Sequence, residues 1–561
     1  MQLIECVPNF SEGQDMTIIR QITDAIESVD GVHLLDVDPG KATNRTVVTF
    51  VGEPAAVVEA AFLAIKKACD LIDMRQHKGE HPRMGATDVC PLVPVSGITM
   101  EETADWAIKL AKRVGEELNL PTYLYEAAAS TPERKNLATI RAGEYEGLPE
   151  KIIQPTWKPD FGPATFNAKS GATVIGARDF LIAYNVNLNT TSVRRANSVA
   201  FDIREKGRVV NDPLTGKPMK DETGEPIRQA GWLKGVKGIG WFIEEYGIAQ
   251  VSMNITDTSQ TSLQEAFEAC CKSAEQRGMR VTGSELVGLV PLNVLLEAGK
   301  HFLNKQKRSL GVNEEEIIKI AIKSMGLDEL SPFDPNKKII EYNIASKNGG
   351  KLGPLVSKNL RAFANETASE SPAPGGGSIS AYVAALGASL ATMVANLSSH
   401  KRGWDDQWKT FSDAAERGQY LKDALLQAVD EDTAAFNAIM AAFSLPNSSP
   451  EEKTARKKAI QDATKIAIEV PAKILRLAAE TMPLVRQMVE SGNPNSITDA
   501  GVGALCIRAA IHGALLNVKI NITGLEDKSF AETILAECQT LADIADKEEA
   551  ALLQLINSKI K

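Results

Sequence analysis

The sequence predicts a mixed α/β half followed by an all-helical half: two ferredoxin-like β-α-β-β-α-β subdomains and then a helical bundle. Stretches of period two alternate with stretches of helical period in the first part of the chain. The order strand, helix, two strands, helix, strand occurs there twice. From residue 357 onward nearly every segment has helical spacing. With 561 residues, the chain is long enough for more than one domain.

The first unit begins with a strand at residues 2–7, where polar and apolar side chains alternate. A turn at residues 8–13 ends this strand and can aim Asn9, Ser11 and Glu12 into a cleft. The later elements of this unit and its extension are helices at 16–29, 54–73 and 101–118, strands at 32–38, 45–52, 86–95 and 122–125, and a loop at 154–170.

The second unit repeats the order of the first. Its elements are a strand at 180–188, a helix at 193–206, a hairpin of strands 241–245 and 249–255, a helix at 261–277 and a strand from 279. Residues 207–231 are a polar insertion that we expect to be a mobile surface loop. Two packed copies of one unit place a cleft between them, which is a usual position for a ligand.

The helical half follows a helix at 314–323 and a segment rich in Pro, Lys, Asn and Gly. Residues 327–353 are predicted to link the domains, which are 1–178 and 179–326 for the α/β subdomains and 354–561 for the bundle. Residues 379–397 carry no charge, yet Ala, Ser and Gly make them too weakly apolar for lipid. They predict a fully buried central helix of a bundle or a subunit interface. Further helices are expected at 415–443, 453–482 with a break or kink at Pro471, and 528–559.

Composition narrows the class of protein. The net charge of -10 argues against nucleic-acid binding and against an anionic membrane surface. An anionic substrate must therefore be held by a local basic pocket. The seven cysteines form no CxxC pair, which is typical of a reducing cytosol, and the N-terminus shows no signal peptide. We therefore expect a cytoplasmic protein.

The loop at residues 75–88 concentrates ionisable groups. His77 and His81 lie four residues apart, accompanied by two arginines, a lysine and two carboxylates. Two glycines and a proline prevent a helix, so this is a shaped loop that favours an active site over a polar loop with incidental histidines. An HxxxH spacing without a third ligand is a weak metal signal, and we expect no metal. The nearby segment 36–45 places Asp38, Asn44 and Arg45 at the same end, although a long hairpin turn explains it equally well.

Two features mark the helical half. The glycine run in residues 371–378 lets backbone N–H groups approach a ligand and then starts a helix, an arrangement that favours negative charge; a flexible linker is the alternative. The carboxylates at 430–432 lie beside apolar side chains and can hold a proton near neutral pH if they are not on a solvated face.

Several of these stretches together resemble one known family. Residues 7–13 (VPNFSEG), 79–91 (GEHPRMGATDVCP), 176–189 and 283–291 (GSELVGLVP) resemble glutamate formimidoyltransferase. Residues 372–378 (PAPGGGS), the helix with Asp432 and residues 492–517 resemble formimidoyltetrahydrofolate cyclodeaminase. Their order in one chain is similar to that of the bifunctional formimidoyltransferase-cyclodeaminases.

The resemblance implies two successive reactions of histidine degradation. A formimino group moves from N-formimidoyl-L-glutamate to N5 of tetrahydrofolate, and the product then closes onto N10 with loss of ammonia. Tetrahydrofolate, polyglutamylated, is a co-substrate, no metal or redox cofactor is needed, and the protein is a homo-oligomer, a ring of dimers.

The resemblance also implies roles for individual residues. It places the catalytic histidine of the transferase at His81 and the acid of the cyclodeaminase at 430–432, where we prefer Asp432 over Asp430. It places folate contacts on Gly162, Pro163, Ala164, Thr165, Phe166, Asn167, Ala168, Lys169, Ser170 and Gly171.

The chemistry of these residues suits the two reactions. An imidazole can take the proton of N5 and return it to departing glutamate. Arg45 or Arg83 could clamp a glutamate carboxylate, and a protonated carboxyl suits the release of ammonia. The backbone amides of Gly375, Gly376 and Gly377, with Ser378, could bind a folate carboxylate or developing charge.

Two other functions stay open at this point. One is a formyl- or formimidoyl-transferase with another amino donor, fused to a methenyltetrahydrofolate cyclohydrolase. The other is a non-catalytic folate-binding scaffold whose helical half only oligomerises.

Overall fold

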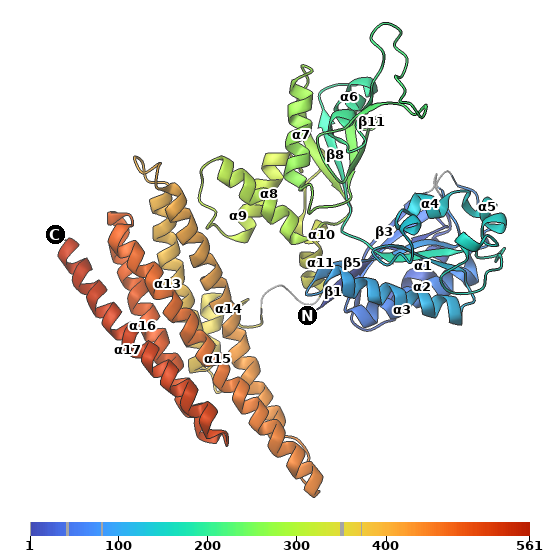
Figure 1. Ribbon diagram of the computed structural model, residues 1–561. Helices are drawn as coiled ribbons and strands as arrows, with labels where there is room; N and C mark the ends of the chain where they lie inside the picture. The colour runs from blue at the N-terminus through green and yellow to red at the C-terminus, as the bar shows by residue number, and fades with distance from the viewer. Residues whose placement is uncertain (1, 41–43, 80–81, 348–352, 372, 561) are drawn as a thin grey trace. The chain divides into compact units, whose positions relative to one another are not determined.

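The computed structural model describes residues 2–40, 44–79, 82–347, 353–371 and 373–560. These residues form two compact units, which we describe separately. The first contains residues up to Val294 together with Met325–Lys347, and the second contains Leu295–Ser324 with the residues from 353 onward. Sheets occur in the first unit, whereas the second consists of helices (Figure 1). The mixed α/β region and the all-helical region predicted from the sequence are thus both present.

The first unit contains a seven-stranded sheet. Its path is β1 (Leu3–Cys6), β4 (Arg45–Gly52), β2 (Asn9–Phe10), β5 (Thr87–Ser96), β7 (Thr173–Ala177) and β6 (Thr122–Glu126), with β3 (Val32–Gly40) on the outer side of β4. Because β1 and β2 both pair with β4 and β5, they act as one strand broken around Pro8. Two residues of the stretch predicted as a turn at 8–13, Asn9 and Phe10, therefore continue the sheet, whereas residues 11–13 leave it.

Helices cover both faces of this sheet. On one face, α1 (Met16–Glu27), α2 (Pro54–Leu71) and α3 (Met100–Glu117) bury their apolar sides against Ile4, Phe50 and Leu92. On the other face, the short helices α4 (Leu137–Arg141) and α5 (Glu144–Lys151) pack on Tyr123 and Val174 (Figure 1). Strand β7, absent from the sequence prediction, runs parallel to β5 and β6 and is fully buried, which explains its lack of alternation.

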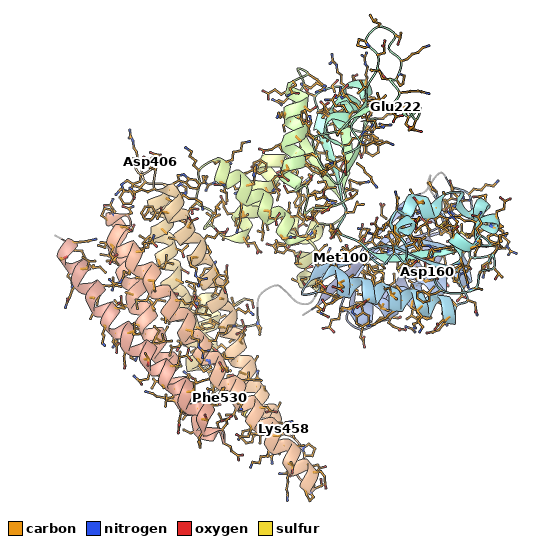
Figure 2. All side chains as sticks on the ribbon, viewed as in Figure 1. Met100, Asp160, Glu222, Asp406, Lys458 and Phe530 are labelled. Atoms are coloured by element: carbon orange, nitrogen blue, oxygen red, sulfur yellow. The ribbon has the colours of Figure 1, made fainter. Side chains whose placement is uncertain are left out.

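A second sheet in the first unit has four antiparallel strands. Its order is β11 (Val236–Ile243), β12 (Ile248–Ile255), β8 (Ile182–Leu188) and β13 (Val281–Val287), with helices α6 (Val193–Ile203) and α7 (Leu263–Glu275) between strands in the chain. The predicted surface insertion at 207–231 contains a small ladder of β9 (Arg208–Val209) and β10 (Arg228–Gln229). Glu222, which lies between β9 and β10 in the chain, is exposed (Figure 2).

The segment predicted as a linker, residues 327–353, is largely folded as far as the structure describes it. It contains α10 (Pro335–Lys338) and α11 (Ile340–Lys347). Ile339 and Ile340 are fully buried, and Ile339 pairs with Val290 of the first unit. Burial of these two isoleucines accounts for the order of this segment, which its polar composition does not indicate. Two earlier helices, α8 (Leu292–Lys305) and α9 (Glu314–Met325), group mainly with the helical unit.

The helical unit is built around α13 (Gly376–Ser399), which packs against α14 (Trp408–Phe443) and α16 (Ile497–Asn521). Its remaining elements are α12 (Leu360–Thr367), α15 (Pro450–Ser491) and α17 (Lys528–Lys559) (Figure 1). The small side chains of α13 allow close approach of α16: a Cβ on Gly387 would lie 2.8 Å from the side chain of Ile507. By length and composition, α13 and the segment Pro494–Gly524 that contains α16 could each cross a membrane. In the structure, 61% of the apolar 18-residue stretch of the first and 50% of that of the second are buried inside the protein.

Two predictions about these helices need correction. Within the single chain, helix α13 is not fully buried as the centre of a bundle, because Leu386, Met393 and Leu397 on one side of it are exposed. The alternative, that this helix lies in a subunit interface, stays a prediction. Helix α15 does not break at Pro471 but continues through it and through Pro483 to Ser491. Burial of Pro471 in the packed unit outweighs the lost backbone hydrogen bond.

The close contact of α13 with α16 predicts the effect of a larger residue at position 387. Gly387→Val should lower the unfolding free energy of the helical unit by ~1–3 kcal/mol, because the new methyl groups meet Ile507 and the Gly503 carbonyl. Thermal unfolding of the full chain measures this. Gly524→Val, where an added Cβ meets nothing within 4 Å, is the matched control. Equal melting temperatures for the two variants would show that α13 and α16 are not in this contact.

Candidate active sites

The first candidate site lies where the loop after α2 enters β5. His77 donates from Nε2 to the Asn44 carbonyl at 2.8 Å, and its Nδ1 accepts from Arg83 Nε at 3.3 Å. This pattern assigns the ring hydrogen to Nε2 and fixes the orientation of the imidazole. The predicted catalytic histidine, His81, and its neighbour Glu80 lie outside the described residues.

Arg83 is held by carboxylates of the same unit. It donates to both oxygens of Glu146, at 2.9 and 2.7 Å, and to Glu144 at 3.2 Å. The hydrogen bonds that it donates to Glu146 raise the pKa of the guanidinium above its usual value. With His77 on its Nε, Arg83 is a residue that orients the loop, and it could clamp a substrate only after giving up Glu146.

A β-bulge aims Asp88 into the site. Asn9 pairs with Val89 and Phe10 with Thr87, so Asp88 is the extra residue of β5. Its carboxylate is fully buried, accepts a hydrogen bond from the Met84 amide at 3.0 Å and forms an ion pair with Arg141.

Two arginines face this carboxylate. Burial lowers the pKa of Arg45, while the charge of Asp88 opposes that shift and the charge of Arg141 adds to it. Arg141 was not found in the sequence, because residues 137–141 showed no pattern that pointed to a site. Its role depends on α4 packing over the sheet near the bulge.

The predicted folate loop, residues 162–171, packs against the histidine loop. The Met74 amide donates to the Lys169 carbonyl at 2.8 Å, and Gly85 pairs with Gly171. Gly171 has φ +68, and a Cβ there would overlap the Met84 carbonyl, so only glycine fits. These contacts bring two segments that are far apart in the sequence to one place.

Side chains of the folate loop are also fixed by neighbours. The ring of Tyr145 lies 5.4 Å from that of Phe166, and its hydroxyl donates to the Ala168 carbonyl at 2.5 Å. Lys169 donates to the Asp70 carbonyl at 2.8 Å, at the end of α2. The lysine is therefore occupied in this structure.

The residues predicted to point into a cleft near the N-terminus have structural partners instead. Asn9 donates to the Val7 carbonyl at 2.9 Å, and Ser11 donates to the Gly85 carbonyl at 2.7 Å. Glu12 accepts from the amides of the two residues before α1, at 2.7 and 2.8 Å. Asn44 does reach the histidine loop, where its amide nitrogen donates to the Lys78 carbonyl at 2.9 Å.

The second candidate site lies in the helical unit, at the start of α13. One oxygen of Asp432 accepts hydrogen bonds from the Ser378 amide at 2.8 Å and from the Ser378 hydroxyl at 2.9 Å. Burial nevertheless raises the pKa of the Asp432 carboxyl, since desolvation outweighs the two bonds from Ser378. A carboxyl in this position is favoured to hold a proton more strongly than an ordinary aspartate does.

A cavity of 150 Å³ adjoins this carboxyl. It is lined by Gly375 and Gly376 at the start of α13, by Asp432, Thr433 and Phe436 of α14, and by Asn517 and Asn521 of α16. Asn517 and Asn521 were not identified from the sequence, although their spacing of four on an apolar helix was an available signal. The cavity combines an acid, amides and an apolar ring.

The glycine run has a steric role at this cavity. A Cβ on Gly377 would overlap the Asp432 carboxylate, and one on Gly376 would lie 3.0 Å from the Asn517 amide. The amide of Ser378 is occupied by Asp432, so that part of the predicted anion cradle serves a carboxylate of the protein itself. Gly375 and Gly376 remain on the cavity wall.

The structure separates the two aspartates that the sequence left open. Asp430 accepts hydrogen bonds from the Leu355 amide at 2.9 Å and the Val356 amide at 3.3 Å. It therefore holds the chain at 353–356 in place. Only Asp432 of this pair lines the cavity.

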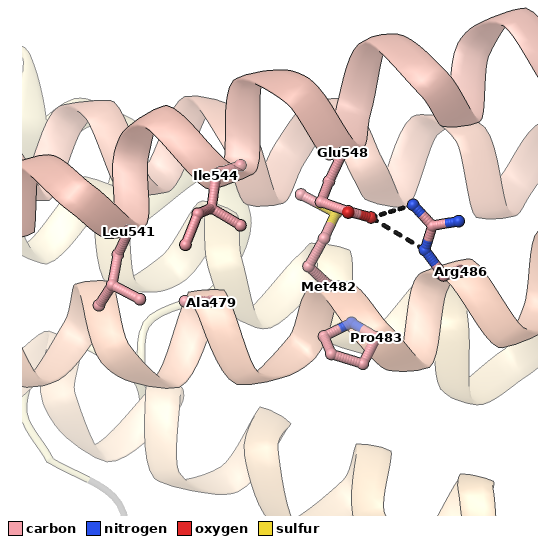
Figure 3. Close-up of a pocket in the computed structure, with 8 residues that line it drawn as sticks. Ala479, Met482, Pro483, Arg486, Leu541, Ile544 and Glu548 are labelled. Atoms are coloured by element: carbon pink, nitrogen blue, oxygen red, sulfur yellow. Dashed lines mark hydrogen bonds and ion pairs between the residues drawn. The ribbon is translucent and has the colours of Figure 1, made fainter.

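A larger cavity of 260 Å³ lies between α15 and α17 (Figure 3). Its walls are mostly apolar, and Arg486 at its edge is paired with Glu548 at 2.9 Å and with Glu490 at 3.1 Å. It offers no group suited to either predicted reaction. Within the described parts of the chain, no cluster of three His, Cys, Asp or Glu side chains could hold a metal ion.

Comparison with known proteins covers both units. Residues 3–178 match the family profile "Formiminotransferase domain, N-terminal subdomain", residues 183–345 match "Formiminotransferase domain", and residues 359–540 match "Formiminotransferase-cyclodeaminase". Over 558 residues, 100% of this chain and 99% of the relative, the sequence is 42% identical to formimidoyltransferase-cyclodeaminase of Rattus norvegicus.

Two relatives match one half each. The first half is 44% identical over 305 residues to glutamate formimidoyltransferase of Thermoplasma acidophilum, covering 54% of this chain and 93% of that protein. The second half is 35% identical over 204 residues to methenyltetrahydrofolate cyclohydrolase of Methylorubrum extorquens, covering 36% of this chain and 98% of that protein.

The raised pKa of Asp432 predicts a pH-dependent effect on stability. An acid with a higher pKa in the folded state destabilises that state as pH rises from the unfolded value through the folded one. Asp432→Asn removes this titration, so the variant should gain melting temperature relative to the parent as pH increases from about 4 to about 8. Asp430→Asn should instead lose stability, because two amides share its carboxylate. If the difference in melting temperature between the parent and Asp432→Asn is the same at every pH, the pKa of Asp432 is not raised in the folded state.

Proposed function

This chain belongs to the formimidoyltransferase-cyclodeaminase family, and from that premise we propose that it catalyses both reactions that the name describes. It transfers the formimino group of N-formimidoyl-L-glutamate to tetrahydrofolate, and it cyclises the 5-formimidoyl product to 5,10-methenyltetrahydrofolate with release of ammonia. The observation that carries the proposal is similarity to relatives of this name along the entire chain.

The transfer reaction is assigned to the first unit. N5 of tetrahydrofolate attacks the amidine carbon, and His81 accepts the N5 proton as the bond forms. The tetrahedral intermediate then collapses, the bond from carbon to the glutamate nitrogen breaks, and the imidazolium returns the proton to that nitrogen. Supporting this assignment, the imidazole of His77, four residues before His81 in the sequence, is held in one orientation, and the folate loop packs against the described part of the histidine loop.

The cyclisation is assigned to the cavity beside Asp432. N10 attacks the formimino carbon of the protonated amidine, and the neutral Asp432 carboxyl gives its proton to the amino nitrogen. The carbon–nitrogen bond breaks, ammonia leaves, and the Asp432 carboxylate takes the N10 proton, which restores the neutral acid. Burial supports this role, because it favours the neutral acid that donates the proton.

A cyclohydrolase is the second candidate activity for the helical unit, favoured by the 35% identity with a protein of that name. In that reaction water, not an amine, adds to or leaves the one-carbon group. The same carboxyl could move the proton, so geometry does not separate the two. Ammonia release from 5-formimidoyltetrahydrofolate distinguishes them, because a cyclohydrolase alone releases none.

Further properties belong to the same proposal. Strand orders β3-β4-β1-β5 and β11-β12-β8-β13 support two ferredoxin-like subdomains. The end of β7 at Ala177 supports a subdomain boundary near residue 178. Polyglutamylated tetrahydrofolate is the co-substrate, no metal takes part, and the protein acts in the cytoplasm as a homo-oligomer without nucleic acid or membrane. Free thiols support the compartment, and the exposed leucines of α13 support assembly.

Paired variants test the assignment of the two activities. His81→Ala should reduce transfer by roughly 10²- to 10⁴-fold and leave cyclisation of supplied 5-formimidoyltetrahydrofolate unchanged. Asp432→Asn should leave transfer unchanged and reduce ammonia release by roughly the same factor. A coupled assay that follows methenyl-folate absorbance and ammonia separates the steps. His512→Gln, which changes a histidine of α16 that lies 2.8 Å from the Asp546 carboxylate, is the control and should keep both rates. Full rates in both active-site variants would show the assignments to be wrong.

The pH dependence of the second step follows from the direction of the pKa shift. Proton donation to the leaving nitrogen needs the neutral carboxyl, and the raised pKa of Asp432 extends that form to higher pH than an ordinary aspartate allows. Single-turnover ammonia release should therefore fall as pH rises through the raised pKa. The Asp432→Asn variant should show a small residual rate without this step. An equal pH step in parent and variant would assign the titration to another group.

A further inference from the structure

Arg141 has an unused hydrogen-bonding edge beside the first site. Its Nε donates to Asp88 Oδ1 at 3.3 Å, and its Nη2 forms the ion pair with Asp88 Oδ2. Among the described residues, no group accepts a hydrogen bond from its Nη1. The side chain keeps 16% of its surface exposed, so it is not sealed in the core of the unit.

A second guanidinium lies close to Arg141. The positive charge of Arg141 lowers the pKa of Arg45, whereas the negative charges of Asp88 and Asp38 raise it. Desolvation of Arg45 lowers its pKa, so its positive charge lacks the solvation it would have in water. Two guanidinium groups, those of Arg45 and Arg141, thus interact electrostatically in this unit, and each can attract an anion.

Arg83, the other arginine of the histidine loop, has no such nitrogen without a hydrogen-bond acceptor. All three nitrogens of the Arg83 guanidinium donate to His77, Glu144 or Glu146. An incoming carboxylate would have to displace a two-bond pair with Glu146. Arg141 needs no such exchange.

We propose that Arg141, with Arg45 beside it, forms the carboxylate-binding subsite of the transferase half. This inference rests on the proposed transfer function and extends it by naming the group that receives an acidic substrate. Two substrates carry carboxylates of this chemistry: the N-formimidoylglutamate donor and the glutamate tail of tetrahydrofolate. Planar guanidinium groups bind such carboxylates through two parallel hydrogen bonds, which a lysine cannot reproduce.

Lys151 acts as a positioning residue for this subsite. Its ammonium donates to the carbonyls of Thr139, Ile140 and Ala142, at 3.1, 2.7 and 2.9 Å, and is 4.0 Å from the Trp157 ring centre. These carbonyls end α4, a helix of five residues that is too short to be stable alone. Lys151 thereby fixes the turn that carries Arg141 over Asp88.

Steady-state kinetics of Arg141→Lys test the subsite in the full chain. The KM for one carboxylate-bearing substrate should rise about tenfold or more, with kcat changed much less. A rise for N-formimidoylglutamate alone assigns the subsite to the donor, and a rise for tetrahydrofolate polyglutamate alone assigns it to the folate tail. Unchanged KM values for both, or a loss confined to kcat, would overturn the proposal.

Direct binding keeps this test independent of turnover. Calorimetric titration of the parent with L-glutamate and with tetrahydrofolate polyglutamate should show binding of at least one, weakened about tenfold or more in Arg141→Lys. If the parent binds one of them through Arg141 yet transfers no formimino group, the subsite stands and the proposed transfer function fails. Equal affinities in parent and variant would reject the subsite whatever the turnover.

Two further variants separate position from fold. Arg113→Lys is the control, because Arg113 lies on α3 and forms ion pairs with Glu117 of the same helix and with Glu59 of α2. This variant should leave both KM values unchanged. Lys151→Met should raise the same KM as Arg141→Lys, whereas a purely structural lysine would lower the melting temperature and the amount of active protein without changing KM. Melting temperatures of all variants, measured in parallel, identify any that fail to fold.

Discussion

The contact between the Asp432 carboxyl and the first turn of α13 constrains the whole helical unit. Two hydrogen bonds from Ser378 hold one oxygen, and Gly377 leaves no space for a side chain between helix and acid. A helix N-terminus favours the ionised form, whereas burial favours the neutral one. Burial prevails here, and the carboxyl faces a cavity with its proton more firmly held. The small residues of α13 contribute to this burial of Asp432, because they allow α13 to pack closely against α14 and α16.

The first unit uses a different device to bring charges together. One extra residue in β5 directs Asp88 toward α4, and the folate loop closes against the histidine loop through backbone pairing at Gly85 and Gly171. The result is a set of alternating charges around a rigid edge of the sheet. Arginines differ within this set: every nitrogen of the Arg83 guanidinium donates to Glu144, Glu146 or His77, while Arg141 keeps Nη1 available. The positions of Arg83 and Arg141 in the sequence do not show which of the two has donors available for a ligand.

Periodicity predicted most of the regular elements, and it failed where burial changed the pattern. The amphipathic helices and the alternating strands of both sheets were found because one face of each meets water. Strand β7 is buried on both faces and shows no alternation. The order in residues 335–347 depends on two buried isoleucines that a polar composition hides. Pro471 suggested a break or kink, yet α15 runs without a break through Pro471 to Ser491.

The candidate sites show the same division. Motifs predicted the histidine loop, the glycine run and Asp432, because their residue types carry the chemistry directly. Arg141, Lys151 and Asn517 reach the sites only through tertiary packing, which one sequence does not display. The choice between Asp430 and Asp432 likewise needed the amides of Leu355 and Val356, which lie 74 or more residues away in the chain.

The protonation of Asp432 is the central claim, and carbon-detected NMR of the aspartate carboxyl groups measures it directly. A titration of the parent chain, compared with that of Asp432→Asn, identifies the one signal that belongs to this residue. We expect its midpoint above 3.8, the ordinary value for aspartate. A midpoint at or below that value would mean that the carboxyl is an ordinary anion at the helix N-terminus, and the proposed proton transfer to the leaving nitrogen would lose its physical basis.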